Sequence, residues 1–174
     1  MAFDGQIRRT GAALLLICGL GLAACGGFVE SGGGVARLTV GTEGGTLTLD
    51  GFALVVPPHA LGETRTLSAH RAATDAPAGP AFVVEPADTM FDAVAPAELA
   101  LNYDGALHTH AAEVFVAVFA AGGWHMLAAP TGHTPTLGSA HGLATTGGTF
   151  GVVECPGGVC PAIITDAGVA ADAP

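Results

Sequence analysis

Lysine is absent from this chain of 174 residues, and all five of its cations are arginine. Fifteen acidic residues outnumber them, and the formal net charge is −10. A protein that binds nucleic acid needs a clustered basic face, which a chain so poor in cations cannot build. The composition therefore excludes nucleic acid as a partner.

Side chains that carry out covalent chemistry are also scarce. The sequence has one tyrosine and three serines, Ser31, Ser68 and Ser139. Ser139 is followed two residues later by His141, but a triad requires groups that converge from separate elements and an oxyanion hole. The scattered carboxylates form no pair suited to acid–base catalysis. We therefore expect a protein that is not an enzyme and has no cofactor.

The N-terminus has the parts of an export signal. Met1–Arg9 is short and ends in two arginines, and the apolar run Gly11–Ala24 follows it after one residue. This run is shorter than the about 20 residues that a transmembrane helix needs, but it suits a signal peptide. It leads into Leu22-Ala23-Ala24-Cys25, which resembles the lipobox of bacterial lipoproteins. The alternative is an ordinary secretory signal cut at an A-x-A-like site, with Cys25 incidental.

The lipobox resemblance implies that residues 1–24 are removed and that Cys25 becomes a diacylglyceryl thioether with an acylated amine. Each buried methylene contributes about 0.8 kcal/mol, so two or three acyl chains anchor a protein stably. The mature chain would keep three arginines and fourteen acids, a net charge of −11. Anionic headgroups would repel it, so its membrane attachment has to come from the lipid. Gly26, next to the cysteine, favours the outer over the inner membrane among lipoproteins.

The remaining chain is rich in residues that interrupt helices, with 27 glycines and 11 prolines in the full sequence. Residues 25–34 are predicted to be a lipidated cysteine and a flexible glycine-rich tether. Residues 35–154 divide into short runs with a turn signal about every ten residues, which predicts an all-β, antiparallel β-sandwich. We expect one helical turn at His59–Gly62, and a Cys loop and disordered tail over residues 155–174, with the tail at Pro161–Pro174. The expected strands are Val35–Val40, Thr46–Leu49, Phe52–Val56, Arg65–Arg71, Ala81–Glu85, Ala97–Tyr103, Val114–Ala120, Trp124–Leu127 and Thr149–Val153.

Alternation within these runs predicts the core. Asp50-Gly51 is a strong signal for a two-residue hairpin, and the strand after it should bury Phe52, Leu54 and Val56 on one face. Thr48 and Ser68 belong to the opposite faces of their strands. The other side chains expected between the sheets are Leu47, Leu49, Leu67, Phe91, Leu99, Leu101, Phe115 and Trp124.

About 60 residues, from Gly44 to Tyr103, resemble the opening of a ZU5 domain. The residues that carry the resemblance are Gly44-Gly45-Thr46-Leu47, Gly51–Leu61 with its Pro57-Pro58 pair, Arg65–Ala69, Val84-Glu85-Pro86 and Phe91–Leu99. His59 stands where the family usually has glycine, and of the His-Phe-Ser that is frequent in bacterial members only Phe150 is matched. The resemblance implies a β-sandwich that binds a protein partner and has no known catalytic residues. An unrelated β-sandwich is the alternative.

Two cysteines remain beyond the sandwich, Cys155 and Cys160, separated by Pro-Gly-Gly-Val. In an exported protein such a pair usually forms a disulfide, and closing so short a loop contributes roughly 2 kcal/mol. The alternative is a redox or metal site, although redox motifs space their cysteines C-x-x-C and zinc sites usually include further ligands.

The segment His108-Thr109-His110 places two imidazoles on the same face if it is a strand. With Glu113 or Asp104 as an oxygen ligand, it would be half of a transition-metal site. A solvated loop is the other interpretation. Taken together, the sequence predicts a lipid-anchored cell-envelope protein whose sandwich is a non-enzymatic interaction or structural module with an envelope protein as partner. The alternative is a periplasmic module that binds a metal or a small ligand.

Overall fold

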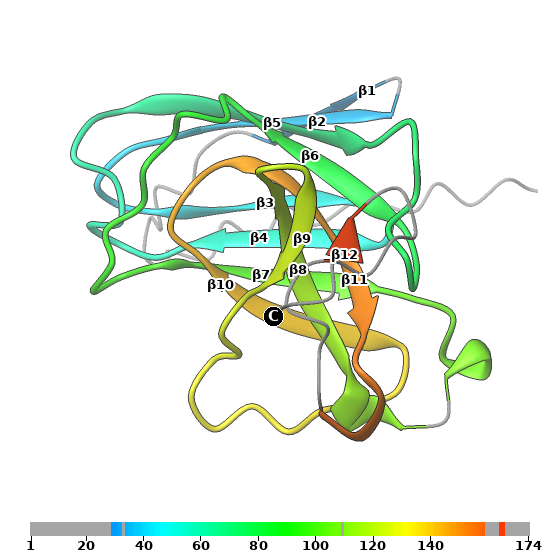
Figure 1. Cartoon of the computed structure of the whole chain (residues 1–174). Coiled ribbons are helices and arrows are strands. Elements are labelled where there is room, and N and C mark those ends of the chain that lie inside the picture. The colour runs from blue at the N-terminus through cyan, green and yellow to red at the C-terminus, as the bar shows by residue number, and fades with distance from the viewer. Residues whose placement is uncertain (1–28, 33, 109, 159–163, 166–174) are drawn as a thin grey trace, which may run out of the picture.

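The protein is a two-layered antiparallel β-sandwich (Figure 1), which confirms the predicted fold class. The computed structural model describes residues 29–32, 34–108, 110–158 and 164–165. The predicted signal peptide, Cys25 and Cys160 lie outside these residues. Among the described residues, no helix is long and apolar enough to cross a membrane.

The two sheets differ in size. The larger sheet has eight strands in the order β1-β2-β5-β6-β11-β8-β9-β12, and the smaller has four in the order β10-β7-β4-β3. Three single-turn 3-10 helices, Gly105–Leu107, Ala111–Glu113 and Pro156–Gly158, complete the described elements. The strands are β1 Val29–Gly32, β2 Val35–Val40, β3 Gly45–Leu49, β4 Phe52–Val56, β5 Arg65–Arg71, β6 Ala81–Glu85, β7 Ala97–Asn102, β8 Val114–Ala120, β9 Gly123–Met126, β10 Ser139–Ala144, β11 Gly148–Glu154 and β12 Ile164–Thr165.

The hairpin predicted at Asp50-Gly51 is present. Leu49 pairs with Phe52, so the loop between β3 and β4 has two residues, and Gly51 takes the positive φ of 75° that glycine adopts without steric cost. The hairpin between β8 and β9 turns through Ala121 and Gly122, both with positive φ. Two positive φ angles define a type I′ turn, whose twist matches that of the flanking strands.

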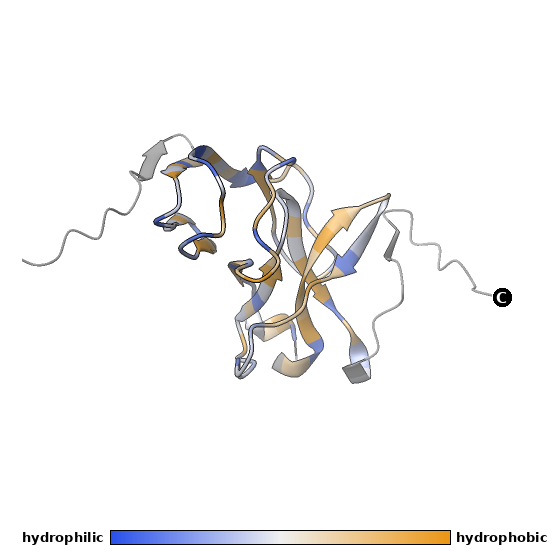
Figure 2. Ribbon diagram, turned by 90° about the vertical axis from the view of Figure 1, so that its left-hand side faces the viewer, coloured by the Kyte–Doolittle hydropathy of each residue, from blue (hydrophilic) through white to orange (hydrophobic). Residues whose placement is uncertain are grey.

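The core between the sheets agrees largely with the prediction. Phe52, Leu54 and Val56 are buried, and Val55 on the other face of β4 is 42% exposed. Thr48 is exposed and Ser68 is half-buried, each on the outer side of its sheet. Figure 2 shows the resulting alternation of hydrophobic and hydrophilic residues along the strands. The other predicted core residues that are buried between the sheets are Leu47, Leu67, Phe91, Leu99 and Leu101.

Three residues of the predicted core lie elsewhere. Leu49 is only partly buried at the edge of the core. Trp124 and Phe115 belong to a second hydrophobic cluster on the outer face of the larger sheet. Neighbours in a strand point to opposite faces, so Val116 and Val152 face the core, whereas Ala117 and Val153 face this second cluster.

The structure also corrects four expectations about segments. Val29–Gly32, part of the predicted tether, forms β1 and pairs with β2, and Ile164–Thr165, part of the predicted disordered tail, pairs with β9. Ser139–Ala144 forms β10, where no strand was expected. Residues 57–60 form a β-turn closed by the bond from Ala60 N–H to the Pro57 carbonyl, 3.2 Å, rather than a helical turn. Backbone pairing explains the three additional strands, because it does not require the regular alternation of bulky residues on which the strand predictions relied.

Candidate functional site

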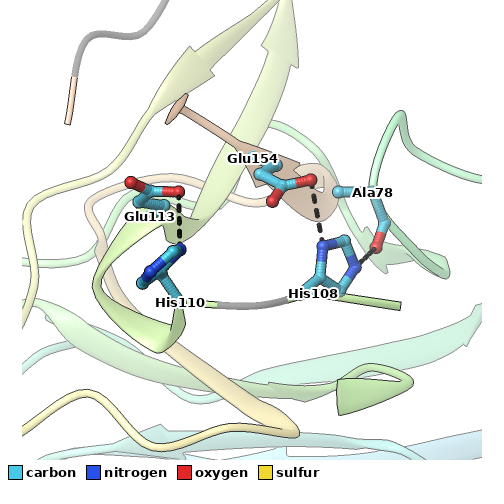
Figure 3. Close-up of polar contacts among 5 residues, drawn as sticks. All are labelled: Ala78, His108, His110, Glu113 and Glu154. Carbon is cyan, nitrogen blue, oxygen red and sulfur yellow. Dashed lines mark hydrogen bonds and ion pairs between the residues drawn. The ribbon is translucent and has the colours of Figure 1, made fainter. Parts of the chain in front are cut away.

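The predicted histidine pair lies in the loop between β7 and β8, residues 103–113. His108 is 8% exposed, and its ring meets that of Tyr103 edge-on at 5.1 Å. Its Nδ1 lies 3.0 Å from Glu154 Oε2 at the end of β11, and its Nε2 lies 3.1 Å from the Ala78 carbonyl oxygen (Figure 3). His108 therefore connects three segments that are far apart in the sequence.

Both partners of His108 are hydrogen-bond acceptors when Glu154 is ionised. A neutral imidazole has one donor nitrogen and one acceptor nitrogen, whereas an imidazolium has two donors. Both contacts are therefore satisfied at once when His108 carries two protons, or when Glu154 carries one. In either state both ring nitrogens face protein atoms, so neither is turned toward an incoming ligand.

His110 faces a different partner. Its Nδ1 lies 3.6 Å from Glu113 Oε2, and Figure 3 shows this pair beside, and separate from, the pair of His108 with Glu154. The other carboxylate oxygen of Glu113 accepts a bond from Gly157 N–H at 2.9 Å, and its carbonyl accepts one from Cys155 N–H at 2.7 Å. Glu113 and His108 thus fasten the segment after β11 to the β7–β8 loop.

This arrangement does not have the form of a metal site. Asp104, one of the two predicted oxygen ligands, accepts a bond from Ala106 N–H at 3.0 Å and caps the first 3-10 helix. Within the described residues, no three or more His, Cys, Asp or Glu side chains are grouped so that they could hold a metal ion. Cys155 is buried in the second hydrophobic cluster, and its pairing with Cys160 stays a prediction.

A second polar group lies on the outer face of the smaller sheet. Ser139 Oγ lies 3.2 Å from His141 Nε2, and His141 Nδ1 lies 3.4 Å from Glu98 Oε1 on the neighbouring strand β7. The ring of His133 is tilted against that of His141, with the centroids 4.2 Å apart. The sequence showed the serine and the histidine but not Glu98, which is 43 residues away.

Contacts link these three residues in the order serine, histidine, acid, as in a catalytic triad. A triad alone is only part of what acyl transfer requires. Ser139 and His141 are alternate residues of one strand, and the backbone N–H of Ser139 already donates to the Thr136 carbonyl at 3.4 Å. An acyl-transfer site needs backbone or side-chain donors aimed at the developing oxyanion. What the described contacts do show is that His141, through Glu98, ties β10 to β7.

A depression of about 190 Å³ lies on the outer face of the larger sheet. Trp124 is only 8% exposed there and meets Phe119 edge-on, at 5.3 Å between centroids. The Asp75 carboxylate is paired with Arg71 at 3.0 Å. The packed indole and the paired carboxylate indicate that this region mainly joins the β5–β6 loop to the sheet. Its lining residues are Ala72, Thr74, Asp75, Val83, Phe119, Trp124 and Thr149.

Comparison of the chain with models of known protein families found no match, and neither did comparison with curated proteins.

Proposed function

We propose that this protein is a lipid-anchored component of a bacterial cell envelope whose β-sandwich is a non-enzymatic interaction or structural module. The observation that carries the proposal is the N-terminal sequence, in which an arginine pair, a short apolar run and Leu22-Ala23-Ala24-Cys25 occur in the order that lipoprotein processing requires. The outer membrane is the favoured location, because Gly26 follows the cysteine.

The side-chain contacts support a module without catalysis. His108, Glu113 and Glu154 are engaged in joining loops to one another, and Asp104 caps a 3-10 helix. His141 and Glu98 link neighbouring strands. A protein of the envelope is the proposed partner, because the resemblance to ZU5 domains implies a module that binds a protein.

The ZU5-like assignment is part of the proposal. His59 supports it, because its φ of 66° lies in the left-handed region that glycine adopts readily. The family usually has glycine at this position, so the turn after Pro57-Pro58 has the backbone form that the family's residue would favour.

Processing of two cysteine variants tests the anchor. Cys25→Ser removes the only thiol at the cleavage site, so we expect the precursor to stay uncleaved and without lipid. Cys18→Ser changes the cysteine inside the apolar run and is the matched control, which should be processed normally. Metabolic labelling with a fatty acid and the electrophoretic size of each variant give the readout. Normal lipid labelling of Cys25→Ser would refute the proposal.

A further inference from the structure

One end of the sandwich is a group of turns that are joined by backbone hydrogen bonds. We call it the turn cluster, residues 41–44, 57–64, 86–96 and 145–147. His59 N–H donates to the Thr42 carbonyl, Asp92 N–H to the Ala60 carbonyl and Phe91 N–H to the Thr145 carbonyl, each at 2.8 Å. The cluster lies at the left of Figure 1, and Figure 2 looks onto it.

The first strand of the sandwich begins at the same end. Val29, the first residue of β1, pairs with Leu38, and β2 ends two residues later, at Val40, where the chain passes into the turn cluster. Because β1 is antiparallel to β2, Val29 is the end of β1 that is nearer to the turn cluster. Cys25 precedes Val29 by four residues, which span at most about 14 Å when fully extended.

The pairing of β1 with β2 shortens the predicted tether, because only three residues, 26–28, separate Cys25 from the first strand. Nine residues between Cys25 and β2 would span about 30 Å and would let the domain rotate freely. With β1 in place, a lipid on Cys25 would hold the turn cluster close to the bilayer.

Exposed hydrophobic residues lie at both ends of the sandwich. Met90 is 66% exposed and Val94 is 93% exposed in the turn cluster. At the opposite end, Leu107 is 76% exposed and Leu137 is 56% exposed. Both pairs expose apolar surface to water, but only the first pair lies at the end of the sandwich where β1 begins at Val29.

We propose that the turn cluster rests on the lipid bilayer, with Met90 and Val94 in the boundary between headgroups and acyl chains. The inference depends on the proposed lipid anchor and adds an orientation to it. Apolar side chains bind at this boundary because their surface is removed from water, and charged side chains are attracted or repelled by the charges of the lipid headgroups.

The charged side chains near Met90 and Val94 indicate which headgroup charge this end of the sandwich would tolerate. Arg65 is paired with Glu63 at 2.8 Å and approaches Asp88 at 3.8 Å. Glu43 and Asp92 add two further carboxylates to the cluster. A net negative end is repelled by anionic headgroups, so zwitterionic lipid is the surface that this end fits.

Fluorescence quenching of the protein, purified from bacteria that express the whole precursor and mixed into phosphatidylcholine vesicles, tests the orientation. Val94→Cys and Leu107→Cys each carry the same environment-sensitive dye, and the vesicles contain a lipid with a spin label near the headgroup. We expect the dye at residue 94 to be quenched and the dye at residue 107 to keep its fluorescence. Quenching at residue 94 should fall when phosphatidylglycerol replaces part of the phosphatidylcholine.

Flotation of the same vesicles separates the two proposals. If the protein floats with the vesicles but residue 94 is unquenched, or if both sites are quenched equally, the orientation is wrong and the anchor stands. If the protein does not float at all, the anchor is wrong and the orientation falls with it.

Discussion

The hydrophobic residues between the two sheets and those on the outer face of the larger sheet are buried in different ways. Leu54 and Leu99 pair across β4 and β7 and face the opposing sheet. Trp124 has no sheet opposite it and is covered by the β5–β6 loop, through Ala76. Within the described residues, the outer face of the larger sheet has no second sheet packed against it, so a loop supplies the hydrophobic cover there.

The two clusters therefore differ in whether regular strand geometry alone determines which side chains come into contact. In the central core, the spacing of alternate residues decides which side chains meet. In the outer cluster, burial depends on the β5–β6 loop packing directly against the sheet. We expect the central core to dominate the free energy of unfolding and the outer cluster to be sensitive to small changes in volume.

The largest effect is expected for Leu54→Ala. Leu54 is fully buried, and truncating a buried leucine costs about 2–5 kcal/mol. Thr48→Ala, on the exposed face of the adjacent strand, is the control and should change stability by less than about 0.5 kcal/mol. Urea midpoints of the two variants give the comparison. Equal shifts would show that the register of β3 and β4 is wrong.

Gly151→Ala tests the outer cluster. A Cβ at residue 151 would collide with the Ala76 Cβ and lie 2.8 Å from Trp124 Cη2. Overpacking of this kind costs about 1–3 kcal/mol. Trp124 is the only tryptophan, so its emission should also shift toward that of an exposed indole.

The matched control for Gly151→Ala is Gly62→Ala, since a Cβ at residue 62 would meet no atom within 4 Å. It should leave both the urea midpoint and the emission unchanged. Wild-type emission in Gly151→Ala would mean that the β5–β6 loop does not hold the indole against the sheet.

The fold was more predictable than the polar contacts, for a physical reason. Alternation identified β4 because Phe52, Leu54 and Val56 are bulky and regularly spaced. It missed β10, where Gly142 faces the core and a Cβ there would come within 2.8 Å of the Val116 Cβ, so that the strand needs a residue with no side chain. Alternation also cannot say which face of β9 is inside, and Trp124 was assigned to the wrong one.

The polar contacts depend on residues that are distant in sequence. His108 and Glu154 are 46 residues apart, and their meeting follows from the pairing of β8 with β11. The prediction that His108 and His110 act together rested on their proximity in the chain, whereas the loop turns them toward different carboxylates.

A smaller effect is expected when Cys155 and Cys160 are both replaced by alanine. Glu113 holds Cys155 N–H and Gly157 N–H independently of any disulfide. The loss should not exceed the roughly 2 kcal/mol expected for so short a loop. Thiol labelling of the exported wild-type protein without reductant should detect no free sulfhydryl. A much larger loss of stability would show that the loop itself organises the outer cluster.

The smallest change in the free energy of unfolding is expected for His59→Gly, which should raise it rather than lower it. A residue other than glycine in the left-handed region lowers the stability of the folded state by about 1–2 kcal/mol, which the substitution by glycine would recover. The greater conformational freedom of glycine in the unfolded chain takes back about 0.5–1 kcal/mol of that gain. The variant should therefore be more stable than the wild type by up to about 1.5 kcal/mol. Ala60→Gly, at a buried position without positive φ, should be less stable. Thermal midpoints measured on both variants decide the sign.

The most direct test of the lipid anchor is the intact mass of the N-terminal peptide from protein purified out of the membrane fraction. We predict a peptide that begins at Cys25 and carries a diacylglyceryl group on sulfur and an acyl group on its amine. A peptide that begins at an unmodified Cys25, or at any other residue, would contradict it.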